Sequence, residues 1–96
     1  MAETERQLRA TVIISGRVQG VWFRGTTVEM ARPIGLTGYV RNRPDGCVEA
    51  VFEGPETGVM RAVTWCHHGP RSASVESVDV TWGEPTGEYG SFSTRY

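Results

Sequence analysis

Residues 8–35 read LRATVIISGRVQGVWFRGTTVEMARPIG, a run that passes from one periodicity to another without a linker. Residues 8–15 are rich in β-branched side chains and place apolar side chains on one parity, which predicts a strand. From Phe23 onward, apolar and small residues recur at helical spacing until Pro33 and Gly35 end the pattern. A strand that leads directly into a helix favours a domain of mixed α and β structure.

Beyond this run, the sequence predicts a β-hairpin, a second helix and two more strands. The hairpin turns within residues 43–46, Arg-Pro-Asp-Gly, because Pro-Asp-Gly is a strong turn signal between two β-forming runs. Near Ser77 the apolar positions change parity, so we expect a bulge there. In chain order the strands are expected at residues 36–42, 47–53, 75–82 and 92–96. The second helix is expected to begin at Pro55 and to stop at Gly69-Pro70.

The order strand, helix, hairpin, helix, strand is that of the ferredoxin-like or split βαβ fold. We therefore predict an α+β sandwich in which two helices cover one face of an antiparallel sheet, with a short additional C-terminal strand. The chain has 96 residues, of which 39% are hydrophobic, so it is long enough for one core and too short for two. Residues 1–96 are expected to form this single domain, with residues 1–7 as a flexible N-terminal extension.

Charge and composition argue against several classes of partner and of chemistry. Ten cations and 11 anions give a net charge of −1, which disfavours nucleic acid. All ten cations are arginine, so a lysine Schiff base and a Walker-type phosphate lysine are both excluded. No apolar run is long enough to span a membrane, and the polar residues 1–9 are unlike a signal peptide. We expect a cytoplasmic monomer.

Cysteines and histidines offer no obvious chemistry. Cys47 and Cys66 lack the spacing of a zinc site and are too few for a disulfide framework, so we interpret them as free buried thiols. His67 and His68 are adjacent and therefore point in different directions, and we interpret them as exposed residues at the end of a helix. Neither a metal nor a cofactor is expected.

The most informative segment is Gly16–Arg24, GRVQGVWFR, where the first strand leads into the first helix. Glycines let the backbone curl, a helix N-terminus presents unpaired N–H groups, and Arg24 follows in the first turn. These are the parts of an oxyanion cradle. The spacing fits neither a Walker A motif nor GxGxxG, which indicates a small phosphorylated ligand. Alternatively, the segment is a sharp strand-to-helix turn and Arg24 forms a surface ion pair.

The same segment resembles the signature of the acylphosphatase family. A second stretch, Gly35–Asn42 (GLTGYVRN) followed by Asp45-Gly46, is similar to the second motif of that family, and the resemblance extends over nearly the whole chain from about Leu8. It implies a ferredoxin-like fold and hydrolysis of the carboxyl–phosphate bond of small acyl phosphates without metal or cofactor.

Carried over by position, the resemblance implies that Arg24 and the backbone amides of Gln19, Gly20, Val21, Trp22, Phe23 and Arg24 bind the phosphoryl group. It also implies that Asn42 orients the attacking water. The sequence departs from the family pattern at Trp22, where glycine is common, at Tyr39, where tryptophan is common, and at Pro33 in the last turn of the helix. None of these departures removes Arg24 or Asn42.

The proposed site suits this substrate on chemical grounds as well. The leaving carboxylate has a conjugate acid with a pKa of about 4, so it departs without a general acid. Phosphoryl transfer chiefly requires in-line positioning and stabilised equatorial oxygens, which amides and one bidentate arginine supply. The alternative is a non-catalytic ferredoxin-like module that binds an anionic ligand or another protein, because this fold supports both kinds of function.

Overall fold

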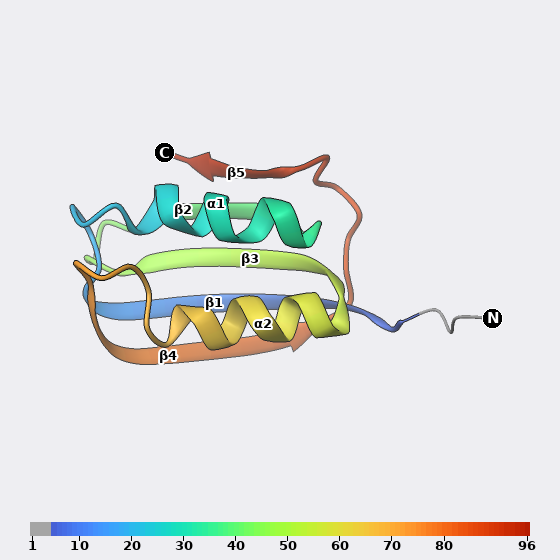
Figure 1. Ribbon diagram of the computed structural model, residues 1–96, viewed down its shortest axis with the longest axis horizontal. Coiled ribbons are helices and arrows are strands. Elements are labelled where there is room, and N and C mark those ends of the chain that lie inside the picture. Colours follow the sequence, from blue (N-terminus) through green and yellow to red (C-terminus); the bar gives the residue numbers. More distant parts are fainter. Residues whose placement is uncertain (1–4) are drawn as a thin grey trace.

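The structure is a computed structural model that describes residues 5–96 (Figure 1). Within that range a single five-stranded sheet packs against helices on one of its faces. In chain order the elements are β1 (Gln7–Arg17), α1 (Phe23–Ile34), β2 (Thr37–Asn42), β3 (Val48–Pro55), α2 (Glu56–Cys66), β4 (Ser74–Gly83) and β5 (Phe92–Arg95). No helix among these residues is long and apolar enough to cross a membrane.

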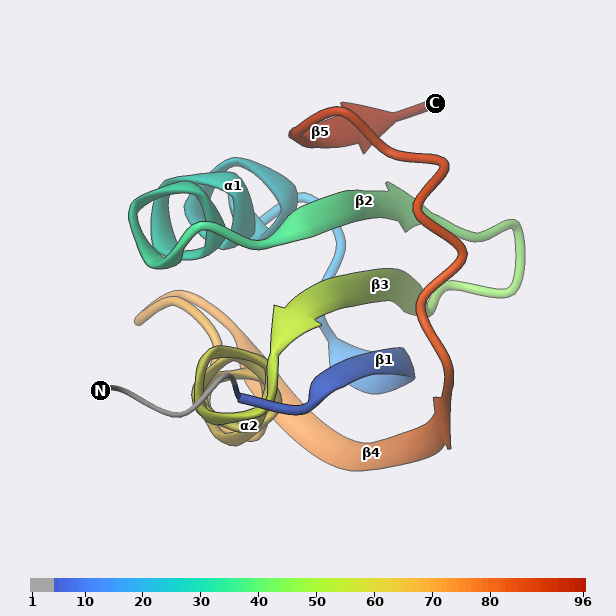
Figure 2. The same ribbon diagram turned by 90° about the vertical axis from the view of Figure 1, so that its right-hand side faces the viewer.

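The strand order is β4-β1-β3-β2-β5, and the first four strands pair antiparallel. Figures 1 and 2 show α1 and α2 side by side on the same face of the sheet, with α1 over β2 and α2 over β1 and β3. This arrangement is the ferredoxin-like fold that the order of the elements predicts.

The orientation of β5 differs from the expected antiparallel sheet, because β5 runs parallel to β2, with Thr94 beside Val40. The connection explains this orientation. After β4 the chain crosses the sheet at one end and begins β5 there, so β5 runs against β4 and therefore along β2 (Figure 2). The sheet is thus mixed, and β5 brings the C-terminal residues to the end of β2.

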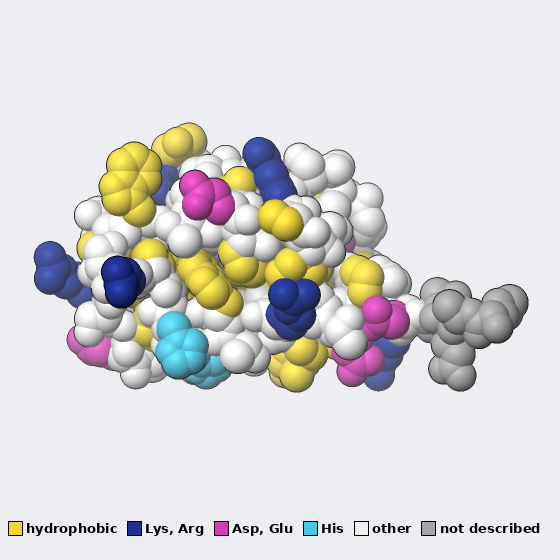
Figure 3. All heavy atoms as spheres, viewed as in Figure 1, with side chains coloured by type: hydrophobic (Ala, Val, Ile, Leu, Met, Phe, Trp, Pro, Cys, Tyr) yellow, Lys and Arg dark blue, Asp and Glu magenta, His cyan; other side chains and the backbone are white. Residues whose placement is uncertain are grey.

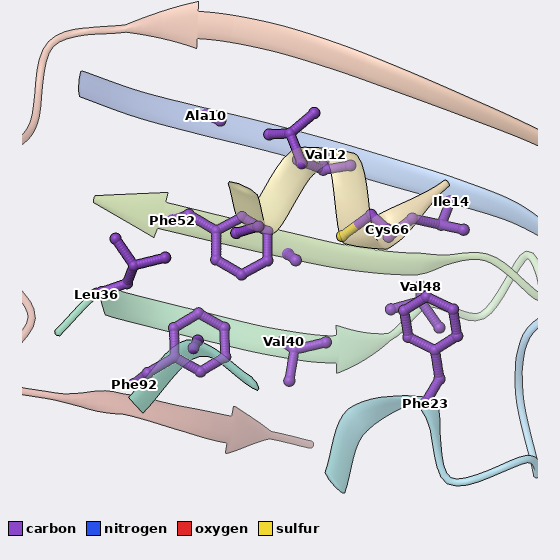
Figure 4. Close-up of a cluster of buried hydrophobic side chains, with 14 of the residues drawn as sticks. Ala10, Val12, Ile14, Phe23, Leu36, Val40, Val48, Phe52, Cys66 and Phe92 are labelled. Atoms are coloured by element: carbon purple, nitrogen blue, oxygen red, sulfur yellow. The ribbon is translucent and has the colours of Figure 1, made fainter. Parts of the chain in front are cut away.

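The hydrophobic core fills the space between the sheet and the helices (Figure 4). Phe52 of β3 and Phe92 of β5 stack with ring centroids 5.2 Å apart, and Phe23 at the start of α1 meets Trp65 of α2 edge to face at 5.5 Å. The remaining core side chains come chiefly from β1, β2, β3 and the two helices, and the fully buried ones include Ala10, Val12, Ile14, Val40, Val48, Val59 and Cys66.

Most predicted ends and irregularities of the elements agree with the structure, but α2 ends at Cys66, before the expected stop at Gly69-Pro70. The register between β1 and β4 shifts between Ser15 and Gly16, opposite the segment around Ser77 where a bulge is expected. Helix α1 runs through Pro33 to Ile34, and Gly35 then adopts the left-handed conformation with φ 88°. Glycine suits that position because it has no Cβ to clash.

The expected extension over residues 1–7 is only partly described, because residues 1–4 lie outside the described range. Residues 5–7 contact the end of β3 and the start of α2. Gln7 already pairs with Pro55 in the sheet, the carbonyl of Arg6 accepts the N–H of Glu56, and the Glu5 carboxylate accepts the N–H of Thr57 at 3.1 Å. The carboxylate thus lies at the N-terminus of α2, where the helix dipole favours negative charge.

The loop between β4 and β5 crosses the face of the sheet that the helices leave open (Figure 2). It covers Glu53, whose side chain is buried, although alternation along β3 suggests a solvent-facing position. One Glu53 oxygen accepts hydrogen bonds from Arg9 (2.5 Å) and from the Thr86 N–H (3.0 Å), and the other accepts the Gly87 N–H (3.2 Å). Burial alone raises the pKa of Glu53, but these donors outweigh it and leave the pKa below its ordinary value. Glu53 therefore fastens the loop to the sheet as a carboxylate.

Candidate active site

The loop between β1 and α1 turns the chain sharply into the helix. Gly20 has φ 73°, and Trp22, the residue just before α1, has φ 64°. Trp22 is the only residue other than glycine with a positive φ among residues 5–96. A left-handed backbone costs an L-residue roughly 1–2 kcal/mol, so the turn holds Trp22 in a conformation that it would not adopt freely.

Contacts on both sides fix this loop. The Val21 side chain is buried in the core, and its carbonyl accepts a 2.7 Å hydrogen bond from the Ser72 hydroxyl. The Gln19 side-chain amide donates to the carbonyl oxygens of Arg43 (2.8 Å) and Cys47 (2.9 Å), which flank the β2–β3 turn. Gln19 therefore ties the loop to the hairpin, and its side chain is already committed to these carbonyls.

The N–H groups of the loop remain open. No backbone carbonyl in the described part of the chain accepts a hydrogen bond from the N–H groups of residues 19–24. Four N–H groups at the start of any helix lack partners within the helix, and the curled loop adds its own groups to them. A run of unpaired N–H groups at a helix N-terminus is a ready site for an anion.

Arg24 lies in the first turn of α1 and is half-buried. Among residues 5–96 no carboxylate forms an ion pair with its guanidinium, although four other arginine–carboxylate ion pairs occur there. The guanidinium carbon lies 4.9 Å from the centroid of the Tyr96 ring. A ring face attracts the cation without occupying its N–H donors, so these donors remain available to a ligand.

Asn42 is the last residue of β2 and pairs with Val48 across the hairpin. Its side chain is half-buried and makes no hydrogen bond to another described residue. A carboxamide both donates and accepts, so an open Asn42 side chain is able to hold a water molecule by either function.

Arg24 and Asn42 line one cavity of about 430 Å³ at the end of the sheet where β1 leads into α1. The lining combines residues of the β1–α1 loop with residues of α1, β2 and β5 and the C-terminal Tyr96. The lining residues are Val18, Gly20, Trp22, Phe23, Arg24, Gly25, Asn42, Thr94 and Tyr96. One arginine, one asparagine, open N–H groups and no Asp or Glu side chain in the lining make this cavity suitable for an anion with a nearby water.

Comparison with known proteins agrees with this chemistry. The acylphosphatase family model matches residues 10–94. The chain belongs to the acylphosphatase family. Over 85 residues it is 56% identical to an acylphosphatase of Roseiflexus sp. (strain RS-1), an alignment that covers 88% of this chain and 91% of the relative. It is 47% identical over 90 residues to the acylphosphatase of Anaeromyxobacter dehalogenans (strain 2CP-C), with 94% and 97% covered. The family and the enzyme class predicted from the sequence are confirmed.

Solved structures of acylphosphatases have the same architecture. The crystal structure of acylphosphatase from Bacillus subtilis superposes with a TM-score of 0.88 at 36% sequence identity, covering 93% of this chain and 99% of that one. The acylphosphatase fold is therefore present here, and its short parallel strand β5 contributes to the cavity.

The structure brings together most of the residues that the sequence singles out. Of the predicted phosphate-binding set, Gly20, Trp22, Phe23 and Arg24 line the cavity. Gln19 and Val21 do not line it, because the Gln19 amide faces the hairpin and the Val21 side chain faces the core. Of Gln19 and Val21, only the backbone N–H groups remain open.

Sequence reasoning missed Thr94 and Tyr96. They reach the cavity through the parallel pairing of β5 with β2, in which Arg95 lies beside Arg41 and Tyr96 follows at the level where β2 ends. The apolar alternation of residues 92–96 predicts a strand but does not say which strand it joins. The only sequence signal for their part in the cavity is the aromatic side chain of Tyr96.

The hairpin that carries Asn42 is stabilised by its own turn. The Asp45 carboxylate accepts the Cys47 N–H (3.0 Å) and forms an ion pair with Arg43 (3.0 Å). The Cys47 N–H, with help from Arg43, lowers the pKa of Asp45 below its ordinary value. Asp45 is therefore ionised at neutral pH, and its carboxylate interacts with Arg43 and Cys47 of the turn itself.

The cysteines and histidines lie outside the cavity lining. Cys66 is fully buried, and burial raises the pKa of its thiol to about 12, whereas Cys47 is only half-buried, contrary to expectation, because it lies at the edge of the hairpin turn. His67 and His68 are exposed and follow α2 directly. Among residues 5–96, no three His, Cys, Asp or Glu side chains are grouped closely enough to hold a metal ion.

Proposed function

We propose that the protein hydrolyses the carboxyl–phosphate bond of small acyl phosphates in the cavity between the β1–α1 loop and the end of β2. The observation that carries the proposal is that Arg24 and Asn42, neither paired with a charged group of the described chain, open into one cavity beside unpaired loop N–H groups. In this reading the loop and Arg24 bind the phosphoryl oxygens, and Asn42 orients the water.

The phosphoryl group is bound by two kinds of donor. The open N–H groups of residues 19–24 supply fixed dipoles, and the Arg24 guanidinium supplies a charge and a fork of N–H donors that matches two phosphoryl oxygens. In the transition state, negative charge spreads over the equatorial oxygens, so donors already aimed at them stabilise it without reorganising. The anchors at Val21 and Gln19 support this role because they hold the loop in its curled form.

The reaction then needs one bond formed and one broken. Water held by Asn42 forms the new oxygen–phosphorus bond, while the phosphorus–oxygen bond to the acyl group breaks and its electron pair leaves on the carboxylate. The water proton passes to a phosphoryl oxygen, and inorganic phosphate is released. A carboxylate is a good enough leaving group to depart unprotonated, which agrees with a cavity that contains no acidic side chain.

The test is carboxylate release from benzoyl phosphate by the purified protein in the presence of a chelator. We expect hydrolysis well above the uncatalysed rate, and the rate is expected to be the same with and without the chelator. Loss of activity that returned on adding a divalent ion would reject the site proposed here.

Inorganic phosphate provides a second measurement that does not depend on turnover. It is expected to inhibit competitively and to raise the melting temperature, since the loop should hold the free anion as it holds the phosphoryl group. If Arg24→Ala bound phosphate as tightly as the wild type does, the anion would lie elsewhere. Phosphate binding with no hydrolysis of any acyl phosphate would favour the alternative, a non-catalytic anion-binding module.

We further propose that the protein acts as a monomer in the cytoplasm. Both cysteines are free, which suits a reducing compartment. The cavity is built from one chain, so the proposed reaction needs no second copy. Light scattering of the purified protein measures the first point, and fractionation of the cells that make it measures the second.

A further inference from the structure

Trp22 is conspicuous because it combines a strained backbone with an almost fully exposed side chain. Its φ is 64°, and 83% of the residue is accessible to solvent. The other two tryptophans of the chain are less exposed than Trp22. Trp65 meets Phe23 edge to face, whereas no aromatic ring or cation of the described chain contacts the Trp22 ring. Burial within the chain therefore does not explain a tryptophan here, and a strained residue at the rim of a cavity suggests a role toward a ligand.

Trp22 is held in place at the rim. Its carbonyl accepts hydrogen bonds from both the N–H (3.0 Å) and the hydroxyl (2.8 Å) of Thr26. A Cβ built on Gly25 would lie 3.5 Å from Cε3 of the indole, so the edge of the ring lies over the first turn of α1. In Figure 3, hydrophobic side chains stand out at the end of the molecule that carries the β1–α1 loop and the C-terminus. The indole thus presents an open, apolar surface directly beside the phosphoryl cradle.

The chemistry of the reaction says which part of the substrate reaches that surface. Attacking and leaving oxygens lie roughly in line through phosphorus. With water on the Asn42 side, the acyl group lies on the opposite side of phosphorus, away from the end of β2. The most exposed side chains of the lining are Trp22 and Tyr96, and the Tyr96 ring already faces Arg24 at 4.9 Å. The indole of Trp22 is the surface that remains for the acyl group.

We propose that Trp22 is the residue that selects the acyl group, and that the substrates preferred by this site are acyl phosphates with an aromatic acyl group. This inference rests on the function proposed above. An aromatic acyl group stacks on the indole, whereas an acetyl group is too small to cover it, so the preference comes from one favourable contact and needs no further pocket.

The experiment compares kcat/KM for benzoyl phosphate and acetyl phosphate in the wild type and in Trp22→Gly. Stacking of one aromatic pair corresponds to a factor of about three to ten, so the ratio of the two constants is expected to fall by about that factor in the variant. Glycine relieves the positive φ, so the variant is expected to melt no lower than the wild type. Trp22→Phe keeps an aromatic surface and should retain most of the ratio.

The matched control is Trp82→Ala. Trp82 is also an exposed tryptophan, at 47%, but it lies on β4 beside Arg6 and Met60, outside the candidate site. Removing it should leave the benzoyl-to-acetyl ratio within about twofold. A ratio unchanged in Trp22→Gly, with both substrates still hydrolysed, would overturn the inference while leaving the proposed function intact.

Binding of phosphonates separates the two proposals without catalysis. Calorimetry with phenylphosphonate and methylphosphonate measures the value of the aromatic group when no bond breaks. We expect the wild type to bind phenylphosphonate about three to ten times more tightly, and Trp22→Gly to lose that advantage. Equal affinities in the wild type would reject the role of Trp22, whereas failure to hydrolyse either acyl phosphate would instead reject the function on which it rests.

Discussion

Glu53 and Arg24 are charged residues beside the same sheet, and the chain treats them in opposite ways. Glu53 is buried, with each carboxylate oxygen accepting hydrogen bonds from the chain itself. Arg24 is half-buried, and among residues 5–96 it has only a ring face near its guanidinium and no carboxylate. The Glu53 carboxylate is therefore committed to the chain itself, whereas the N–H donors of the Arg24 guanidinium stay available to a ligand.

The difference separates polar groups that stabilise the fold from polar groups that stay open to a ligand. A buried charge without partners costs several kcal/mol, so the Glu53 region must be satisfied internally for the chain to fold. Around Arg24 and Asn42 the side chains stay partly exposed, so solvent is able to satisfy them and they remain open to the anion proposed above. Substitutions in the two regions should therefore separate loss of activity from loss of stability.

The largest effect is expected from Arg24→Ala. Because Arg24 is proposed to bind the phosphoryl group in both the ground state and the transition state, kcat/KM should fall by on the order of 10³ or more, and phosphate binding should be lost. The free energy of unfolding should change by no more than about 1 kcal/mol, since only the contact with the Tyr96 ring is removed. Steady-state kinetics and urea unfolding measure the two quantities.

Arg24→Lys is the matched control, and it should rescue little, because a point charge does not reproduce the guanidinium fork. If Arg24→Ala lowered the free energy of unfolding by several kcal/mol, Arg24 would be a structural residue, as Glu53 is.

Asn42→Ala should have the next largest effect. Asn42 is proposed to hold the water alone, so kcat should fall by on the order of 10² to 10³ while KM and the affinity for phosphate stay within a few-fold. Steady-state kinetics and phosphate calorimetry make this distinction. A strong rise in KM at unchanged kcat would mean that Asn42 binds the substrate and that another group positions the water.

Glu53→Gln tests the opposite region. The substitution removes the charge that Arg9 and the Thr86 and Gly87 N–H groups share, so the free energy of unfolding should fall by about 3 kcal/mol. The kcat of the folded fraction should stay within about twofold of the wild type. Urea unfolding followed by tryptophan fluorescence provides the measurement, and a hundredfold loss of kcat in folded protein would contradict the separation of the two regions.

The same residue makes a prediction about pH. The folded pKa of Glu53 lies below its ordinary value of 4.5, so its contribution to stability is complete above that value and is lost as pH falls through the folded pKa. The wild type should therefore lose more stability than Glu53→Gln when unfolding is compared at pH 7 and in the acid range below 4.5. Equal losses in the two proteins would show that Glu53 is not held as a carboxylate.

The smallest effect is expected from the double variant His67→Ala with His68→Ala. Both side chains are exposed after the end of α2, and a leaving carboxylate needs no general acid. We expect kcat/KM within about twofold of the wild type at pH 7. A hundredfold drop with the fold intact, checked by circular dichroism, would assign a histidine to the reaction.

The two regions were not equally predictable from sequence. Arg24 lies within nine residues that form a strand end, a turn and a helix start, so local patterns are enough to bring the cradle together. Glu53 alternates with core residues and for that reason looks exposed. Its burial depends on a loop that lies more than thirty residues further along the chain and comes back over the sheet.

Long-range pairing also accounts for the orientation of β5 and for the share that Thr94 and Tyr96 have in the cavity. Periodicity specifies which side of a strand faces the core, but it carries no information on the neighbouring strand. The left-handed backbone of Trp22 was hidden for another reason, since a tryptophan gives no local signal for positive φ, as glycine does at Gly20. The family resemblance predicts the site at Arg24 and Asn42, and the structure adds Thr94 and Tyr96 to the lining of the cavity that these residues share.

The parallel course of β5 has a practical consequence for anyone who expresses this protein. It places Tyr96 in the lining of the cavity, while the described chain begins at Glu5, at the opposite end of the molecule (Figure 1). A purification tag or reporter fused after Tyr96 would emerge beside this cavity. Glu5 lies far from the cavity, so affinity handles, surface attachment and fluorescent labels belong on the N-terminal side.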